Sequence, residues 1–301
     1  MNFSILTPSF NQLAYLKRCV ASISDQTSEP VDHRVIDGGS TDGTLDFLKE
    51  YPKSIARSSS GYSFFYTSEP DRGMYDALNK GLNQCLTSIA EESKDPQEHI
   101  IAWLNCDEQY LPGALHQVAH CFKTHPNADF IYGDALMIRP DGRLLTCRKN
   151  PPLRPMYVLA DHLYTQSAAL FFRSTAFTSG LRFNPAWKAV GDCDLILRLF
   201  QAGFRAQQLK SYLAACVMTG SNISQGPSGV TELEQFRKQS PLLFQHGRPL
   251  FNALRYIEKA LRNGYRQAVP FEYELWLEQS TARTKQIATT ASCRFQWGEK
   301  S

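Results

Sequence analysis

Residues 31–44, VDHRVIDGGSTDGT, decide the fold, because a short strand-like run passes directly into a glycine-rich turn and then into a helix start. Positions 31–36 are expected to form a strand. The glycines after Asp37 allow positive φ and a close approach of the backbone to a ligand, and Ser40 to Asp42 are good helix N-caps. A strand, a turn and a helix in this order predict one unit of an α/β domain.

Strand-like and helical patterns alternate through the first half of the chain. The expected strands lie near 3–7, 31–36, 64–68, 99–104 and 129–133. The segment between the first two carries apolar residues at helical spacing: Leu13, Leu16, Val20 and Ile23. Such alternation is typical of a parallel sheet joined by right-handed crossovers. We therefore predict an α/β fold with a Rossmann-like, mostly parallel central sheet flanked by helices.

The composition is that of an ordinary globular protein of 301 residues, 43% of them hydrophobic and 20% charged. A formal net charge of +3 is too small to indicate a nucleic-acid binder, which would concentrate Lys and Arg to neutralise phosphates. The eight cysteines form no CxxC pairs, so neither a zinc site nor a disulfide framework is expected. No stretch has the pattern of a signal peptide or a membrane span. These features predict a cytoplasmic protein.

The chain changes character after about residue 225, where its pattern becomes helical and more polar. We predict a main domain over 1–225 and a helical C-terminal extension over 226–301. The extension has an apolar stripe and, opposite it, a basic one: Leu250, Leu254, Ile257 and Leu261 against Arg255, Lys259, Arg262 and Arg266. Such a helix could lie peripherally on the anionic inner face of the cell membrane. It could equally pack on the main domain with its charges in solvent.

Polar clusters follow several of the expected strands, where ligands bind in open α/β sheets. The first is Thr7-Pro8-Ser9, and the second begins at Asp37 and includes Gly39. The Asp37 carboxylate could accept hydrogen bonds from a base or a ribose. The second cluster could also be no more than a strand-to-helix turn with its cap.

The third cluster, Asn105-Cys106-Asp107-Glu108, places two adjacent carboxylates directly after an apolar strand. Adjacent like charges repel unless a cation or solvent relieves them. A divalent cation shared with nucleotide phosphates would do so, and Mn²⁺ or Mg²⁺ suits oxygen ligands of this kind. A solvated loop is the alternative.

The fourth cluster lies at the start of a helical pattern that begins at Gly191. Asp192 shares a helical face with Leu195 and Leu199, so its carboxylate is turned toward a packed surface. A carboxylate there could act as a general base toward an acceptor hydroxyl. The alternative is a simple N-cap.

Taken in this order, the motifs resemble the family 2 glycosyltransferases of the GT-A fold. SILTPSFNQLAYLKRCVASISDQT at 4–27 and VIDGGSTDGT at 35–44 resemble the family's first two blocks. SEPDRGMYDALNKG at 68–81 is similar to the third block of a subgroup linked to bacterial polysaccharide, O-antigen or colanic-acid-type assembly. The likeness covers about 3–225, and implies that this is the nucleotide-sugar-binding and catalytic domain.

The resemblance also implies roles for individual residues. Asp107 would be the principal metal ligand, with Glu108 as a second, and Asp192 the catalytic base. The expected donor contacts are Thr7, Pro8, Ser9, Asp37, Gly39, Asp71, Arg72, Asp76, Lys80, Asn105 and Cys106. Asn105 departs from the aspartate that opens a DxD motif, and Leu78 stands where many relatives carry an arginine. The segment 218–224, MTGSNIS, resembles one that closes over the diphosphate.

The expected activity is a metal-dependent, inverting sugar transfer from a nucleotide-diphosphate donor, a UDP-sugar by default. The acceptor would be the hydroxyl of a glycan or a lipid-linked glycan, in cell-surface polysaccharide or glycolipid synthesis. One alternative is a protein that binds a nucleotide sugar or glycan without turnover. Another is a sugar nucleotidyltransferase, which would usually carry a Gly-rich basic loop where TPSFNQ stands here.

Overall fold

A nine-stranded sheet forms the centre of the protein, in a computed structural model that describes residues 1–55, 61–93, 95–220, 222 and 226–294. The strand order is β3-β2-β1-β4-β8-β6-β9-β5, and β7 pairs with β6 outside this path. Its strands are β1 (Asn2–Ser9), β2 (Val31–Asp37), β3 (Tyr62–Ser68), β4 (His99–Trp103), β5 (Glu108–Tyr110), β6 (Phe130–Ile138), β7 (Leu144–Arg148), β8 (Leu170–Arg173) and β9 (Ala206–Val217).

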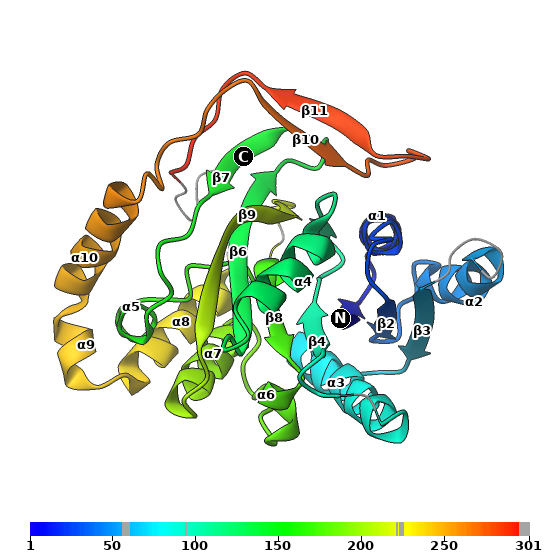
Figure 1. Ribbon diagram of the computed structural model, residues 1–301, viewed down its shortest axis with the longest axis horizontal. Helices are drawn as coiled ribbons and strands as arrows, with labels where there is room; N and C mark the ends of the chain where they lie inside the picture. The colour runs from blue at the N-terminus through cyan, green and yellow to red at the C-terminus, as the bar shows by residue number, and fades with distance from the viewer. Residues whose placement is uncertain (56–60, 94, 221, 223–225, 295–301) are drawn as a thin grey trace.

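Helices flank this sheet (Figure 1), as the sequence predicts. Those of the first 217 residues are α1 (Leu13–Ser24), α2 (Thr44–Ile55), α3 (Met74–Glu91), α4 (Ala114–Thr124), α5 (Pro155–Ala160), α6 (Thr175–Thr178), α7 (Gly191–Gln201) and the 3₁₀ turn η1 (Ser167–Ala169). The half β3-β2-β1-β4 is parallel, whereas β5, β7 and β8 pair antiparallel to their neighbours. All five strands expected from the sequence are present, and the α/β fold class is confirmed.

The register of the parallel half aligns the ends of its strands. Ser9 of β1 lies opposite Asp37 of β2, which lies opposite Ser68 of β3. The segments that follow these strands therefore leave the sheet at one edge, together with the segment that follows β4. This alignment brings polar residues from distant parts of the sequence to one end of the domain.

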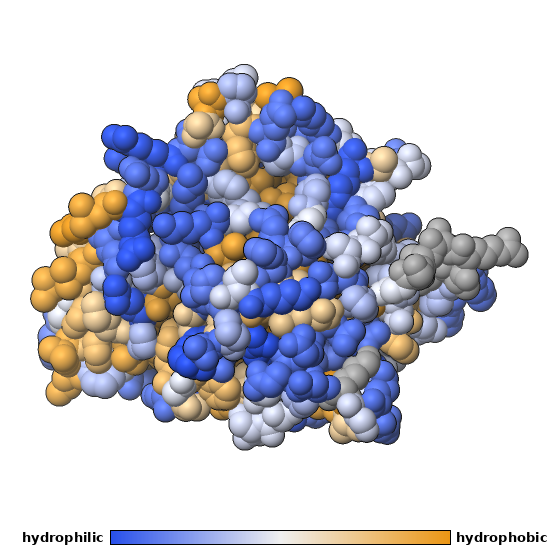
Figure 2. All heavy atoms as spheres, in the orientation of Figure 1, coloured by the Kyte–Doolittle hydropathy of each residue, from blue (hydrophilic) through white to orange (hydrophobic). Residues whose placement is uncertain are grey.

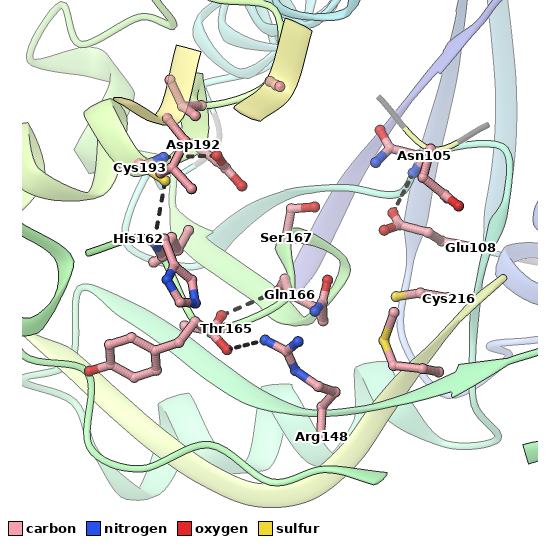
Figure 3. Close-up of a pocket in the computed structure, with 18 of the residues that line it drawn as sticks. Asn105, Glu108, Arg148, His162, Thr165, Gln166, Ser167, Asp192, Cys193 and Cys216 are labelled. Atoms are coloured by element: carbon pink, nitrogen blue, oxygen red, sulfur yellow. Dashed lines mark hydrogen bonds between the residues drawn. The ribbon is translucent and has the colours of Figure 1, made fainter. Parts of the chain in front are cut away.

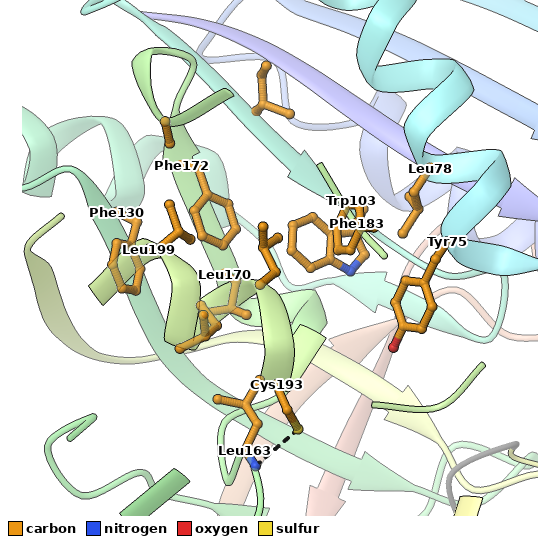
Figure 4. Close-up of a cluster of buried hydrophobic side chains, with 14 of the residues drawn as sticks. Tyr75, Leu78, Trp103, Phe130, Leu163, Leu170, Phe172, Phe183, Cys193 and Leu199 are labelled. Carbon is orange, nitrogen blue, oxygen red and sulfur yellow. Dashed lines mark hydrogen bonds between the residues drawn. The ribbon is translucent and has the colours of Figure 1, made fainter. Parts of the chain in front are cut away.

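A cluster of buried aromatic rings packs across strands β4, β8 and β6 (Figure 4). The Trp103 ring, at the end of β4, stacks on Phe172 of β8 with centroids 5.3 Å apart, and Phe172 stacks on Phe130 at 5.4 Å. All three side chains are essentially inaccessible to solvent. Close-packed rings of this kind tolerate little displacement. The chain that leaves β4 toward Asp107 therefore starts from a rigid point.

The C-terminal extension is helical only in part. Three helices follow the main domain, α8 (Pro227–Gln239), α9 (Leu242–His246) and α10 (Arg248–Leu261). The segments β10 (Phe271–Leu275) and β11 (Thr284–Ala288) instead pair as an antiparallel hairpin. The prediction of a helical extension over 226–301 is therefore wrong for this hairpin. The FEYEL sequence of β10 alternates apolar and acidic residues, and its Tyr273 and Leu275 side chains are buried against β6 and β9.

The orientation of α10 is the reverse of what its amphipathic pattern suggests. Leu250 is 61% exposed and Leu261 is 79% exposed, whereas Arg255 on the opposite side is 4% exposed. The apolar stripe faces solvent. Arg255 and Lys259 of the basic stripe face the domain, whereas Arg262 and Arg266, beyond the end of α10, are exposed. Figure 2 shows the resulting hydrophobic area over α9 and α10, at the left of the view. None of the described helices is both long and apolar enough to cross a membrane.

Candidate active site

A cavity of about 1360 Å³ opens beyond the ends of β1 and β4 and reaches α7 and α10. It gathers residues from all the polar clusters that the sequence singles out. The predicted residues that line it are Pro8, Ser9, Asp71, Asn105, Cys106, Asp107, Glu108 and Asp192. In Figure 3, Asp192 lies on one side of this cavity, and Asn105 and Glu108 lie on the other.

The carboxylates of Asp107 and Glu108 form the first centre. The Glu108 Oε2 accepts a hydrogen bond from the Asn105 backbone N–H at 2.8 Å, and the Asp107 Oδ2 accepts one from the Asn222 side-chain amide at 2.9 Å. Burial raises the pKa of Asp107 to about 6. Burial and the neighbouring Asp107 charge raise the pKa of Glu108 to about 8. Both groups would therefore gain from a cation beside them.

The oxygen atoms at this centre fit a divalent cation that also binds a ligand. Among the residues that the structure describes, no three His, Cys, Asp or Glu side chains come together as a metal-binding group. The centre offers two carboxylates and the Asn105 Oδ1, a buried oxygen with no hydrogen-bond partner in the described chain. Oxygen donors are what Mg²⁺ and Mn²⁺ prefer, and phosphates of a bound nucleotide commonly complete their coordination.

Asp192 forms the second centre, in the first turn of α7. Its Oδ1 accepts the Cys193 backbone N–H at 2.9 Å and lies 3.5 Å from the Tyr75 hydroxyl. The N-cap position of α7 belongs to Val190, so Asp192 is not the cap. Burial raises the pKa of Asp192 to about 6. The carboxylate is thus a proton acceptor near neutral pH with one side open to the cavity.

Tyr75 and Gly191 set the position of Asp192. The Tyr75 hydroxyl accepts the Asp192 backbone N–H at 3.3 Å. A Cβ on Gly191 would lie 2.7 Å from the Tyr75 ring, so no other residue fits there without moving the ring. The ring itself stacks on Phe183, with centroids 5.4 Å apart. α3 and α7 are therefore held together at the point where the carboxylate enters the cavity.

Two predicted donor contacts lie behind the cavity wall. The Thr7 hydroxyl is fully buried and pairs with the His33 ring at 2.9 Å. The Asp37 carboxylate is also buried and accepts hydrogen bonds from the backbone of Gly39 and Ser40 and from the Ser68 hydroxyl. It shapes the turn that carries Gly38, which borders the cavity where a Cβ would meet Asp71 at 2.7 Å.

Four further predicted contacts lie outside the cavity. Arg72 is mostly exposed and pairs with Asp76 at 2.8 Å, and Lys80 pairs with Glu69 at 2.7 Å. Gly39 also does not line the cavity.

Of the 218–224 segment, residues 221, 223 and 224 lie outside the described residues. Asn222 of that segment contacts Asp107.

Sequence reasoning missed the basic wall at the end of the cavity nearest α10. Arg148, Arg255 and Lys259 line this wall. Beside them, Asp161 accepts from His162 at 2.8 Å and pairs with Arg237, Arg248 and Arg255. Although burial opposes it, the pKa of Asp161 is held well below its usual range by His162, Arg237 and Arg248. In the sequence, the basic stripe that contains Arg255 and Lys259 was the only indication of this wall.

Comparisons with known proteins identify the family of the chain. A family model described as "Glycosyl transferase family 2" matches residues 4–176. A PGL/p-HBAD biosynthesis glycosyltransferase of Mycobacterium bovis is 26% identical over 202 residues, which cover 66% of this chain and 69% of the relative. Because the family model spans more than half of the chain, the protein belongs to glycosyl transferase family 2.

Several solved proteins share the fold at low sequence identity. S. aureus TarS aligns with a TM-score of 0.57 and 14% identity over 95% of this chain and 60% of that chain. Its residues 1–349, solved in complex with UDP-GlcNAc, give a TM-score of 0.55 and 13% identity over 96% of this chain and 100% of that one. A mannosyltransferase from Pyrobaculum calidifontis, in complex with GDP-Man and Mn²⁺, gives 0.52 and 12% over 88% of this chain and 76% of that chain. The GT-A fold is therefore confirmed.

We expect the free energy of unfolding of the metal-free protein to fall as the pH rises. The folded-state pKa of Asp107 and of Glu108 lies above its ordinary value, so the folded state holds these protons more tightly. This contribution is complete below about pH 4 and is lost as the pH rises through about 6 and about 8. Urea unfolding should therefore give a lower free energy of unfolding at the upper end of this range than at its lower end.

The matched variant is Glu108→Gln, which keeps an oxygen for the Asn105 N–H but does not titrate. Its stability should depend less on pH than that of the parent protein. A pH dependence as steep as the parent's would contradict the burial account of this centre.

Proposed function

We propose that the protein transfers a sugar from a nucleotide-diphosphate donor to an acceptor hydroxyl in one displacement, with inversion at the anomeric carbon. The observation that carries the proposal is the placement of Asp107 and Asp192 on one cavity. The name of the mycobacterial relative, a biosynthesis glycosyltransferase, supports a biosynthetic role. We assign the reaction to the synthesis of a cell-surface polysaccharide or glycolipid.

Asp192 acts as the general base in this proposal. Its carboxylate takes the proton of the acceptor hydroxyl, whose oxygen bonds to the anomeric carbon as the bond from that carbon to the diphosphate breaks. With a pKa of about 6, the carboxylate is mostly ionised at neutral pH yet still basic enough to take a proton. Tyr75 and the Cys193 N–H orient it.

The donor lies along the other side of the cavity. Its base and ribose would occupy the end formed by Pro8, Ser9, Gly38 and Asp71. Asp107, with Glu108 and Asn105, would hold Mn²⁺ or Mg²⁺, which neutralises the charge that develops on the departing diphosphate. A uridine diphosphate sugar is the default donor, as in the complex of TarS with UDP-GlcNAc.

A panel of nucleotide sugars with Mn²⁺ tests this assignment through the melting temperature and diphosphate release. One donor should raise the melting temperature by mass action. Asp107→Ala should lose this response, whereas Asp192→Asn should keep it and lose at least about 100-fold in turnover. Asp141→Ala, which removes an exposed carboxylate outside the cavity, is the control.

No response to any donor, with or without metal, would favour a protein that binds glycans without turnover. Pyrophosphate formation from a sugar phosphate and a nucleoside triphosphate would identify a nucleotidyltransferase instead.

We further propose that the protein contacts an anionic bilayer through α9 and α10. The exposed apolar stripe is formed by Leu242, Leu243, Leu250, Leu254, Ile257 and Leu261. Arg262 and Arg266 are exposed where α10 ends, so cations flank the stripe and complement anionic headgroups. A lipid-linked acceptor would then meet the enzyme at the membrane surface.

Sedimentation with phosphatidylglycerol-containing vesicles tests this contact. The Leu254→Glu, Ile257→Glu double variant should bind at least about tenfold more weakly, since burying each side chain stabilises by about 1.5–3 kcal/mol. Ile287→Glu, at an exposed apolar position of the hairpin, is the matched control. Equal binding of the double variant and the parent would rule out this stripe as the contact.

A further inference from the structure

The cavity has a basic end that the proposed chemistry at Asp107 and Asp192 does not use. Arg148 comes from the end of β7, and Arg255 and Lys259 come from α10. Both arginines are buried, at 8% and 4% exposure. Arg148 donates to the Tyr164 carbonyl at 2.9 Å and points into the cavity in Figure 3.

Arg255 has an unsatisfied donor at this end. Its Nη2 lies 3.3 Å from the Asp161 Oδ2, and its guanidinium lies over the Tyr164 ring at 5.2 Å. Its Nη1 is buried and has no hydrogen-bond partner within the described residues. A buried guanidinium N–H without a partner loses the hydrogen bonds that water would give it. A bound acceptor oxygen would restore one.

Positive charge exceeds negative charge around this end. Asp161 is shared by Arg237, Arg248 and Arg255. Burial, together with the positive charges of Arg148 and Arg255, lowers the pKa of Lys259 to about 8. The cations therefore repel one another in a poorly solvated space, and an anion between them would relieve that repulsion.

These cations lie at the opposite end of the cavity from the residues expected to bind the nucleotide. The base and ribose end is built by β1, β2 and the chain after β3, whereas Arg255 and Lys259 belong to α10 on the opposite side of the molecule (Figure 1). A volume of about 1360 Å³ exceeds the roughly 300–1,000 Å³ that one small ligand usually occupies. The cavity has room for a second ligand beside the donor.

We propose that Arg148, Arg255 and Lys259 bind a phosphate group of the acceptor. The inference rests on the proposed function, because it names the acceptor class of that same site. A phosphate offers several oxygens to the guanidinium forks and the ammonium group, and its charge matches the excess of cations. The group would be either the headgroup phosphate of a lipid-linked acceptor or a phosphodiester of a soluble polymer.

Calorimetric titration with methyl phosphate and with octyl phosphate tests this subsite in protein already saturated with UDP and Mn²⁺. The wild type should still bind both probes, because the donor site is filled. Arg255→Gln and Lys259→Gln should each weaken phosphate binding about tenfold, the loss expected for one charge-assisted hydrogen bond. Arg205→Gln, which removes an exposed guanidinium outside the cavity lining, should bind like the wild type.

The two probes distinguish the two sources of phosphate. Tighter binding of octyl phosphate would assign a lipid-linked acceptor, and equal binding would assign a soluble phosphodiester polymer. Acetate that binds as tightly as methyl phosphate would overturn the assignment to phosphate. So would phosphate binding that is absent, or that is the same in the wild type and all three variants.

The design separates this inference from the proposed function. If the wild type binds neither UDP nor any other nucleoside diphosphate of the donor panel, the proposed function fails, and the same phosphate titrations on the free protein still compare the variants. If UDP binds equally to all of them and phosphate binding does not depend on Arg255 or Lys259, only the acceptor inference fails. Lys259→Gln keeps the test valid if Arg255→Gln does not fold, because Lys259 is less buried.

Discussion

An unbroken series of ring contacts connects the two carboxylate centres of the site. Trp103, two residues before Asn105, meets Phe183 at 5.0 Å, and Phe183 stacks on Tyr75 at 5.4 Å. The Tyr75 hydroxyl reaches Asp192. Aromatic packing thus fixes the separation between the end of β4 and the start of α7 (Figure 4). The chemistry proposed for Asp107 and Asp192 requires that this rigid core hold the end of β4 and the start of α7 at a fixed separation.

The charges of the cavity are arranged around that fixed frame. Its β4 side carries buried carboxylates whose pKa values are raised by desolvation, and its α10 side carries buried cations in excess. Neither set is balanced by the described protein groups alone, and each is suited to a ligand of opposite charge. A cation with a diphosphate on one side and an anionic acceptor on the other would leave Asp192 beside the reacting hydroxyl.

The sequence predicts most of the fold and the chemistry-bearing centres because these depend on local pattern. The strand ends near Thr7, Asp37 and Asn105 are visible as apolar runs that stop at polar residues. Whether a side chain faces the cavity or the core depends on tertiary packing. The family resemblance therefore implies donor contacts for Thr7 and Asp37, although the structure buries both. The basic wall was missed because Arg148 and Asp161 carry no local motif. The apolar stripe of α10 faces outward because Arg255, on the opposite side of the helix, pairs with Asp161. Helical periodicity alone does not predict this orientation.

The configuration of the sugar released to water tests the single-displacement account most directly, because water can replace the unidentified acceptor. Proton NMR of the freshly released sugar, followed from an α-linked donor before mutarotation, reports the configuration at the anomeric carbon. The account predicts that the β anomer accumulates first and does not do so in Asp192→Asn. First appearance of the α anomer in the wild type would contradict it.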